Sequence, residues 1–197
     1  ALFDSLKTSP VTELGLAECQ LGPGSLGKLA EYVREATAAL TSLKCANNPG
    51  MVGELHEYGD LETPDAHAEV FKELTDSLKT SQVTEADFSS CGIGPVALGH
   101  LSDWVRDATA VVSSLAISGN FLFGSKDESE YNSTQVHDVD QSGWNNLCEQ
   151  LKVSKITSFT AEDIGMGPVA LRTLATSLPA AIASLTISAN RGIGEAG

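Results

Sequence analysis

Residues 83–120, VTEADFSSCGIGPVALGHLSDWVRDATAVVSSLAISGN, decide the fold, because they hold two copies of one strand-like pattern around a helix-like segment. The pattern is apolar-x-x-apolar-x-apolar-x-x-(Cys or Asn). Apolar residues at alternate positions bury one face of a strand. The first copy has Val83, Ala86, Phe88 and Cys91, and the second has Val112, Leu115, Ile117 and Asn120. Between them, apolar residues spaced by three and four predict a helix.

The same arrangement occurs twice more, in residues 11–48 and 156–190. Val11 lies 72 residues before Val83, and Ile156 lies 73 residues after it. Pro23, Pro95 and Pro168 stand where each helix is predicted to begin, a position that tolerates proline. The six copies of the pattern end at Cys19, Asn48, Cys91, Asn120, Ile164 and Asn190. An ordinary α/β domain with a chance alternation is the alternative, and six copies argue against it.

This pattern resembles the leucine-rich repeat, LxxLxLxxN/CxL, and is most similar to the ribonuclease-inhibitor type, in which Cys-bearing and Asn-bearing repeats alternate. The resemblance implies an α/β solenoid of about six repeats, with parallel strands on a concave face and helices on a convex face. It covers residues 1–197 as one segment, apart from two inserts, and it implies protein–protein binding without naming a partner.

The polar turn residues are expected to form a structural ladder, because Asn and Cys can satisfy buried backbone groups of neighbouring repeats. We expect Cys19 and Cys91 to be buried thiols of that ladder. Ile164 stands where Cys or Asn is expected, so its ladder hydrogen bond should be missing. The expected ladder residues are Cys19, Asn48, Cys91, Asn120 and Asn190.

Two acidic and polar inserts lengthen the repeats, near residues 49–68 and 121–143. Long loops on a rigid scaffold often carry function. The second insert contains the sequence NST, which makes Asn132 a predicted glycosylation site if the chain is secreted.

The second insert also ends in DVDQSGWNNLCE, residues 138–149, which has the spacing of a calcium-binding EF-hand loop. Oxygen ligands at alternate positions of a tight turn can surround one Ca²⁺. A competing interpretation is that Asp140 or Ser142 caps the helix that follows. The expected ligands are Asp138, Asp140, Ser142, Trp144 (through its carbonyl) and Glu149.

Composition narrows the range of partners. The chain carries 26 acidic and 12 basic residues, a net charge of −14, which argues against binding nucleic acid or an anionic membrane surface. No apolar run reaches membrane-spanning length. The sequence shows no P-loop, GxSxG or HExxH motif, and its four cysteines lack metal-binding spacing, so we predict a protein that is not an enzyme and has no cofactor other than the calcium considered above.

The two ends of the sequence match each other. Joining the C-terminal SLTISANRGIGEAG to the N-terminal ALFDSLKTSPVTELGL gives one further Asn-type repeat, with 26 residues from Leu185 to Leu14. That equals the spacing from Phe159 to Leu185. We therefore expect the chain to be one period of a longer solenoid, continued by further repeats of the same chain or by copies of itself stacked head to tail. An arbitrary truncation is the alternative, and it leaves the matched junction unexplained.

The predicted inner face is rich in Ser and Thr and has no aromatic residue. Because binding hot spots favour Trp, Tyr and Arg, this composition argues against a protein partner on that face. The sequence thus favours a structural or interaction repeat unit of a filament, extracellular or at the cell surface, with glycans as possible partners. The alternative is a protein-binding leucine-rich-repeat scaffold, which could equally be cytoplasmic.

Overall fold

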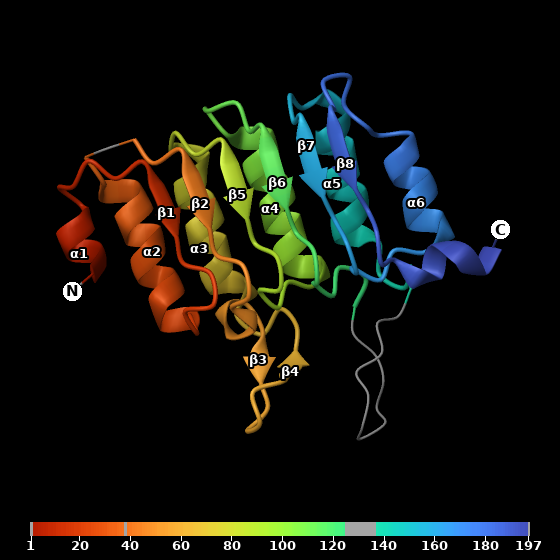
Figure 1. Cartoon of the computed structure of the whole chain (residues 1–197), viewed down its shortest axis with the longest axis horizontal. Helices are drawn as coiled ribbons and strands as arrows, with labels where there is room; N and C mark the ends of the chain where they lie inside the picture. The colour runs from red at the N-terminus through yellow and green to blue at the C-terminus, as the bar shows by residue number, and fades with distance from the viewer. Residues whose placement is uncertain (1, 38, 125–136, 197) are drawn as a thin grey trace.

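The computed structural model describes residues 2–37, 39–124 and 137–196, and builds them into a parallel sheet backed by helices (Figure 1). The sheet has six strands that lie in chain order, and each pairs in parallel with the next. The apolar residue at the centre of each strand lies beside its equivalent in the neighbouring strand, as Leu43 does beside Ala86. The strands are β1 (Glu13–Gly15), β2 (Ser42–Lys44), β5 (Glu85–Asp87), β6 (Ser114–Ala116), β7 (Ser158–Thr160) and β8 (Ser184–Thr186).

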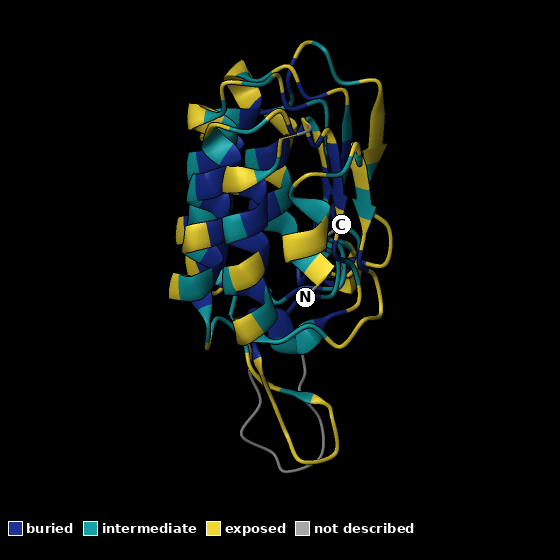
Figure 2. Ribbon diagram, turned by 90° about the vertical axis from the view of Figure 1, so that its left-hand side faces the viewer, coloured by how far each residue is buried: buried dark blue, intermediate teal, exposed yellow. Residues whose placement is uncertain are grey.

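The helices form a single layer against one face of the sheet, as Figure 2 shows. The predicted proline starts are confirmed, because Pro23, Pro95 and Pro168 are the first residues of three of these helices. The elements of this layer are α1 (Leu2–Leu6), α2 (Pro23–Glu35), α3 (Ala68–Lys79), α4 (Pro95–Asp107), α5 (Ser142–Val153), α6 (Pro168–Ala175) and the 3₁₀ helix η2 (Arg191–Ala196).

The expectation of an α/β fold with parallel strands and intervening helices is confirmed at this level. The sheet is open rather than closed into a barrel, and its one-strand-per-repeat order is compatible with a solenoid. The core lies between the sheet and the helix layer, where the apolar positions of the pattern meet the apolar helix faces. Trp104 and Trp144 are fully buried there and belong to helix packing.

The first insert folds as a small projection from one end of the strands (Figure 1). It begins with a 3₁₀ turn, η1 (Pro49–Met51), whose Met51 is buried and anchors it to the core. An antiparallel hairpin follows, made of β3 (Glu54–Leu55) and β4 (Leu61–Thr63). In the second insert, Leu122 and Phe123 are buried, whereas residues 125–136 lie outside the described part of the chain.

Among the described helices, none combines the length and the apolar character needed to span a membrane.

Candidate functional site

The predicted asparagine ladder forms with the same geometry in three places. In the middle of the sheet, the Asn120 side-chain oxygen accepts hydrogen bonds from the backbone N–H groups of Cys91 and Ile93, at 3.0 and 3.1 Å. Its amide nitrogen donates to the carbonyls of Phe88 and Ile117, both at 2.9 Å. Each such Asn therefore ties its own turn to the turn of the preceding repeat.

Asn48 and Asn190 make the equivalent bonds. The Asn48 oxygen accepts from the N–H groups of Cys19 and Leu21, at 3.1 and 2.9 Å. The Asn190 oxygen accepts from Ile164 and Met166, at 3.0 and 3.2 Å, and its nitrogen donates to Ala161 and Ile187.

Of the two cysteines predicted to be buried in the ladder, one is buried and one is exposed. Cys91 is buried, and its thiol donates to the Cys45 carbonyl of the preceding repeat at 3.1 Å. Cys19 is exposed, so the prediction that it is a buried thiol is wrong. The reason is its position in the first repeat, where the described chain places no preceding repeat over it; its thiol instead donates locally to the Ala17 carbonyl. Ile164 is buried in the equivalent position and has no side-chain donor, as the sequence indicates.

Burial makes the three other cysteines poor nucleophiles. It raises the pKa of the Cys45 and Cys148 thiols to about 12, and it raises the pKa of Cys91 well above the ordinary value. A thiol with such a pKa is protonated at neutral pH and reacts slowly, because the thiolate is the reactive form.

The structure does not gather the predicted calcium ligands around one point. Asp138, with a φ of 57°, directs its carboxylate at the first turn of α6. There Oδ1 accepts hydrogen bonds from the N–H groups of Gly167 and Ala170, at 3.0 and 3.1 Å, and Oδ2 accepts from Val169 at 2.8 Å. The carboxylate expected to be the first calcium ligand is therefore occupied by a helix N-terminus.

The remaining predicted ligands are dispersed by helix α5, which begins at Ser142. Asp140 Oδ1 accepts from the Ser142 N–H at 2.9 Å, so the competing helix-start interpretation describes it better. Trp144 is buried and donates its indole N–H to the Ala170 carbonyl at 3.1 Å, while Glu149 is exposed further along the helix. Within the described residues, no group of three or more His, Cys, Asp or Glu side chains could hold a metal ion.

A matching helix cap occurs in the first insert, and the sequence reasoning missed both caps. Asp65, with a φ of 63°, accepts hydrogen bonds from the N–H groups of Gly94, Val96 and Ala97 at the start of α4. Burial raises the pKa of Asp65, although the three backbone hydrogen bonds oppose that shift. A sequence signal exists, because Asp65 and Asp138 each stand 30 residues before the proline that opens the capped helix.

On the open face of the sheet, the face without helices, hydroxyl groups extend the backbone ladder. The hydroxyls of Thr41, Thr84, Ser113 and Thr157 each donate to the carbonyl of the equivalent residue in the preceding repeat, at 3.1 to 3.4 Å. These Ser and Thr side chains are thus engaged in holding adjacent repeats together.

The two edges of the sheet expose residues that are buried in every internal repeat. Within the described chain, β1 pairs only with β2 and β8 only with β7. Leu185 of β8 is 38% exposed, whereas its equivalents Leu43 and Leu115 are 0% and 1% exposed. At the other edge, Leu2 is 59% exposed, whereas Leu74, in the equivalent position of α3, is fully buried.

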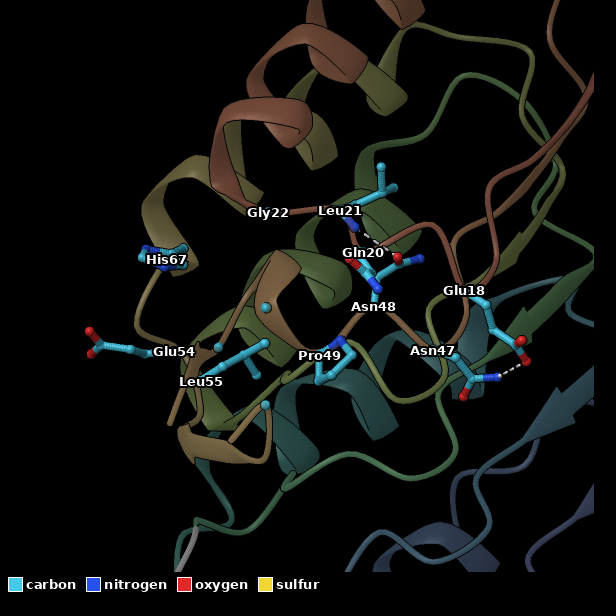
Figure 3. A pocket seen from close by; sticks show the side chains of 13 residues that line it. Glu18, Gln20, Leu21, Gly22, Asn47, Asn48, Pro49, Glu54, Leu55 and His67 are labelled. Atoms are coloured by element: carbon cyan, nitrogen blue, oxygen red, sulfur yellow. Dashed lines mark hydrogen bonds between the residues drawn. The ribbon is translucent and has the colours of Figure 1, made fainter. Parts of the chain in front are cut away.

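A cleft of about 640 Å³ lies between the loop that follows β1, residues 18–22, and the hairpin insert (Figure 3). Leu55 extends across it, His67 lies at its rim, and Glu54 points away from it in this view. On the far side, the Asn47 amide donates to the Glu18 carboxylate at 3.3 Å. The predicted glycosylation site, Asn132, lies outside the described residues.

No protein-family model matches the chain, and no curated protein matches it.

Proposed function

We propose that this chain is a non-catalytic repeat unit of a longer leucine-rich-repeat solenoid, continued at both edges by further repeats or copies. The observation that carries the proposal is the exposure of Leu185 at one edge and Leu2 at the other, since their equivalents inside the chain are buried. An unpaired strand edge is a template for pairing with another strand, and a solenoid repeat buries its core against its neighbours.

The non-catalytic part of the proposal is supported by several nucleophile-type side chains of the described residues that are engaged within the protein. The hydroxyls on the open face donate to backbone carbonyls, and burial keeps three of the four thiols protonated. The hydroxyls thereby contribute to the cohesion of neighbouring repeats.

A direct fusion of two copies, Gly197 to Ala1 without a linker, tests the proposal. If the edges pack on each other, the fused chain unfolds in urea at a higher midpoint than the single chain, because one new interface between neighbours is added. Small-angle scattering should show one elongated body. A control fusion with two extra residues at the joint turns a continuing helix by about 200° and should lose the gain. Equal midpoints for the single and fused chains would contradict the proposal.

We also place this unit outside the cell or at its surface, a proposal that rests on the Asn132 sequon and the net charge of −14. A mobility shift of the native protein after enzymatic removal of N-glycans tests it, with Asn132→Gln as the control. An unshifted native protein would favour the cytoplasmic alternative.

The alternative function, a scaffold that holds a separate protein partner, is favoured by the cleft beside the hairpin. Leu55 and the nearby Tyr58 are both exposed there, and exposed apolar side chains often mark interaction sites. A partner captured by the native chain and lost on Leu55→Asp, while the fused chain keeps its higher midpoint, would support this second function.

A further inference from the structure

The joint between neighbouring copies can be derived from the joints inside the chain. An Asn-type repeat is followed by a repeat at the Cys-type position twice. Where β2 meets β5 that repeat carries Cys91, and where β6 meets β7 it carries Ile164 instead. An Asn-type repeat containing β8 stands at one edge, and a Cys-type repeat containing β1 stands at the other. The two edges are therefore of the kinds that meet at the internal joints.

The internal joints use the same backbone hydrogen bonds. At the first, the N–H groups of Thr84 and Glu85 both donate to the Thr41 carbonyl, at 2.9 and 3.2 Å. In the other direction, Cys45 and Asn47 donate to the carbonyls of Asp87 and Ser89, both at 2.8 Å. The second joint repeats these bonds with Thr157 and Ser158 donating to Ser113, and with Ile117 and Gly119 donating to Thr160 and Glu162.

The edge repeats have the backbone shape that these bonds require. In the Asn-type repeats, the residue before the ladder Asn has a positive φ, 58° at Asn47, 64° at Gly119 and 60° at Ala189. In the Cys-type repeats, the residue before the ladder position also has a positive φ, 57° at Glu18 and 52° at Ser90. The edges thus differ from the internal repeats in exposure but not in this turn conformation.

The helix layer gives an independent indication of the same joint. The sequence SLKTS occurs at residues 5–9, after the start of α1, and at residues 77–81, at the end of α3. Both copies bind the next helix alike, because Thr37 N–H donates to the Lys7 carbonyl and Thr109 N–H donates to the Lys79 carbonyl, both at 2.8 Å.

The ion pairs at the two places also correspond. Lys7 contacts Glu35 at 2.8 Å, and Lys79 contacts Asp107 at 3.5 Å. Helix α1 therefore occupies the place of the C-terminal half of a repeat helix. A cavity of about 250 Å³ lies beside exposed Leu2, between α1 and α2. At the opposite edge, η2 packs beside α6 as the start of such a helix.

We propose that a second copy of this chain docks its β8 edge onto β1 in the register of the internal joints, with its η2 segment continuing into α1. This joint rests on the proposed function and specifies its contacts. Ala183 accepts from the backbone and hydroxyl of Thr12, as Thr41 does from Thr84, and the Cys19 thiol donates to the Ile187 carbonyl, as Cys91 does to Cys45.

Cys19 reports on the joint, because it is the one exposed cysteine among the four in the chain. The 197-residue chain is measured over a series of concentrations from dilute to concentrated. Sedimentation gives its molecular mass, and a disulfide reagent gives the rate at which its thiols react. In the monomer one thiol reacts fast, and Cys19→Ser removes that phase. On association the fast phase should slow at least tenfold, since the thiol becomes buried as Cys91 is.

Cross-linking then tests the register. In the Cys19→Ser background, Glu13→Cys chains are mixed with Ser184→Cys chains, which the internal pairing of Glu85 with Ser42 places side by side. Paired residues of adjacent strands are about 4.8 Å apart, within reach of a disulfide. The matched control is Gly15→Cys, a site with open space for a side chain, which lies about 8 Å from residue 184 in this register and beyond disulfide reach.

The outcomes separate the two proposals. Association with protected Cys19 and with the 13–184 cross-link favoured over 15–184 supports this joint. Association that leaves Cys19 reactive, or that links 15–184 as readily, overturns this register and leaves the continued solenoid standing. A chain that stays monomeric at all concentrations overturns the stacking of separate copies, and the fused chain then decides whether the edges pack at all.

Discussion

Replacing Asn120 by alanine should destabilise the chain strongly, because this side chain satisfies four buried backbone groups at once. Its amide accepts from Cys91 and Ile93 and donates to Phe88 and Ile117, and the side chain is fully buried. Leaving a buried donor or acceptor without a partner costs about 1–3 kcal/mol. The two orphaned N–H groups alone therefore give a loss of about 4 kcal/mol in the free energy of unfolding.

The edge of the sheet supplies a matched comparison. Asn190 makes the equivalent bonds but is 8% exposed in the last repeat. Water can reach the groups left behind by Asn190→Ala, so we expect a smaller loss of about 2 kcal/mol. Asn145→Ala, at an exposed position of α5, is the neutral control, with a change of about 0.5 kcal/mol or less.

The assay is urea unfolding of each variant, followed by circular dichroism and analysed with a common slope. Typical domains are stable by about 5–15 kcal/mol, so the variants should remain folded in dilute buffer. A loss below about 1 kcal/mol for Asn120→Ala would refute the ladder argument. Equal losses of unfolding free energy for Asn120→Ala and Asn190→Ala in a monomer would refute the argument that water reaches the exposed β8 edge.

Three further predictions follow from the packing, the helix caps and the charges. Gly143→Ala should lower the free energy of unfolding by about 1–3 kcal/mol, because its added methyl would meet the backbone of α4. Gly99→Ala has open space around the added methyl and should raise the free energy of unfolding by about 0.5–1 kcal/mol. Thermal melts compare the two variants. Asp138→Ala should lower the stability by about 1–2 kcal/mol equally with calcium or a chelator present, as calorimetry can check. Hydrogen bonds from the Ser142 side chain and backbone hold the pKa of the Asp140 carboxyl below its ordinary value. The folded state therefore gains stability at neutral pH, and this gain is lost as the pH falls through the lowered pKa, which NMR titration of the carboxyl measures.

The alternation of strands and helices could be predicted because it is a local property of the sequence. Apolar residues two apart bury one face of a strand, and apolar residues three and four apart bury one stripe of a helix. The ladder residues Asn48, Asn120 and Asn190 could be placed as well, since each ends a copy of the pattern and Asn can both donate and accept.

The structure separates the predicted calcium ligands for a reason that spacing cannot reveal. Asp138 and Asp140 have the ligand spacing, but the carboxylate of Asp138 binds the backbone of α6, about thirty residues further along the chain. The uncapped N–H groups at the start of a helix attract a carboxylate as a cation does. Which of the two it meets depends on how the insert lies against the next repeat.

Sequence alone determined the repeat, its period and the residues that join one turn to the next, because these follow from short-range patterns that recur. Only the tertiary structure decided that Cys19 is exposed while Cys91 is buried, and that Leu185 is partly exposed while Leu43 is buried. The members of each pair occupy the same position in the pattern, and they differ only in whether a neighbouring repeat covers them. In a stack whose units bury their cores against each other, burial is a property of the neighbour as much as of the residue.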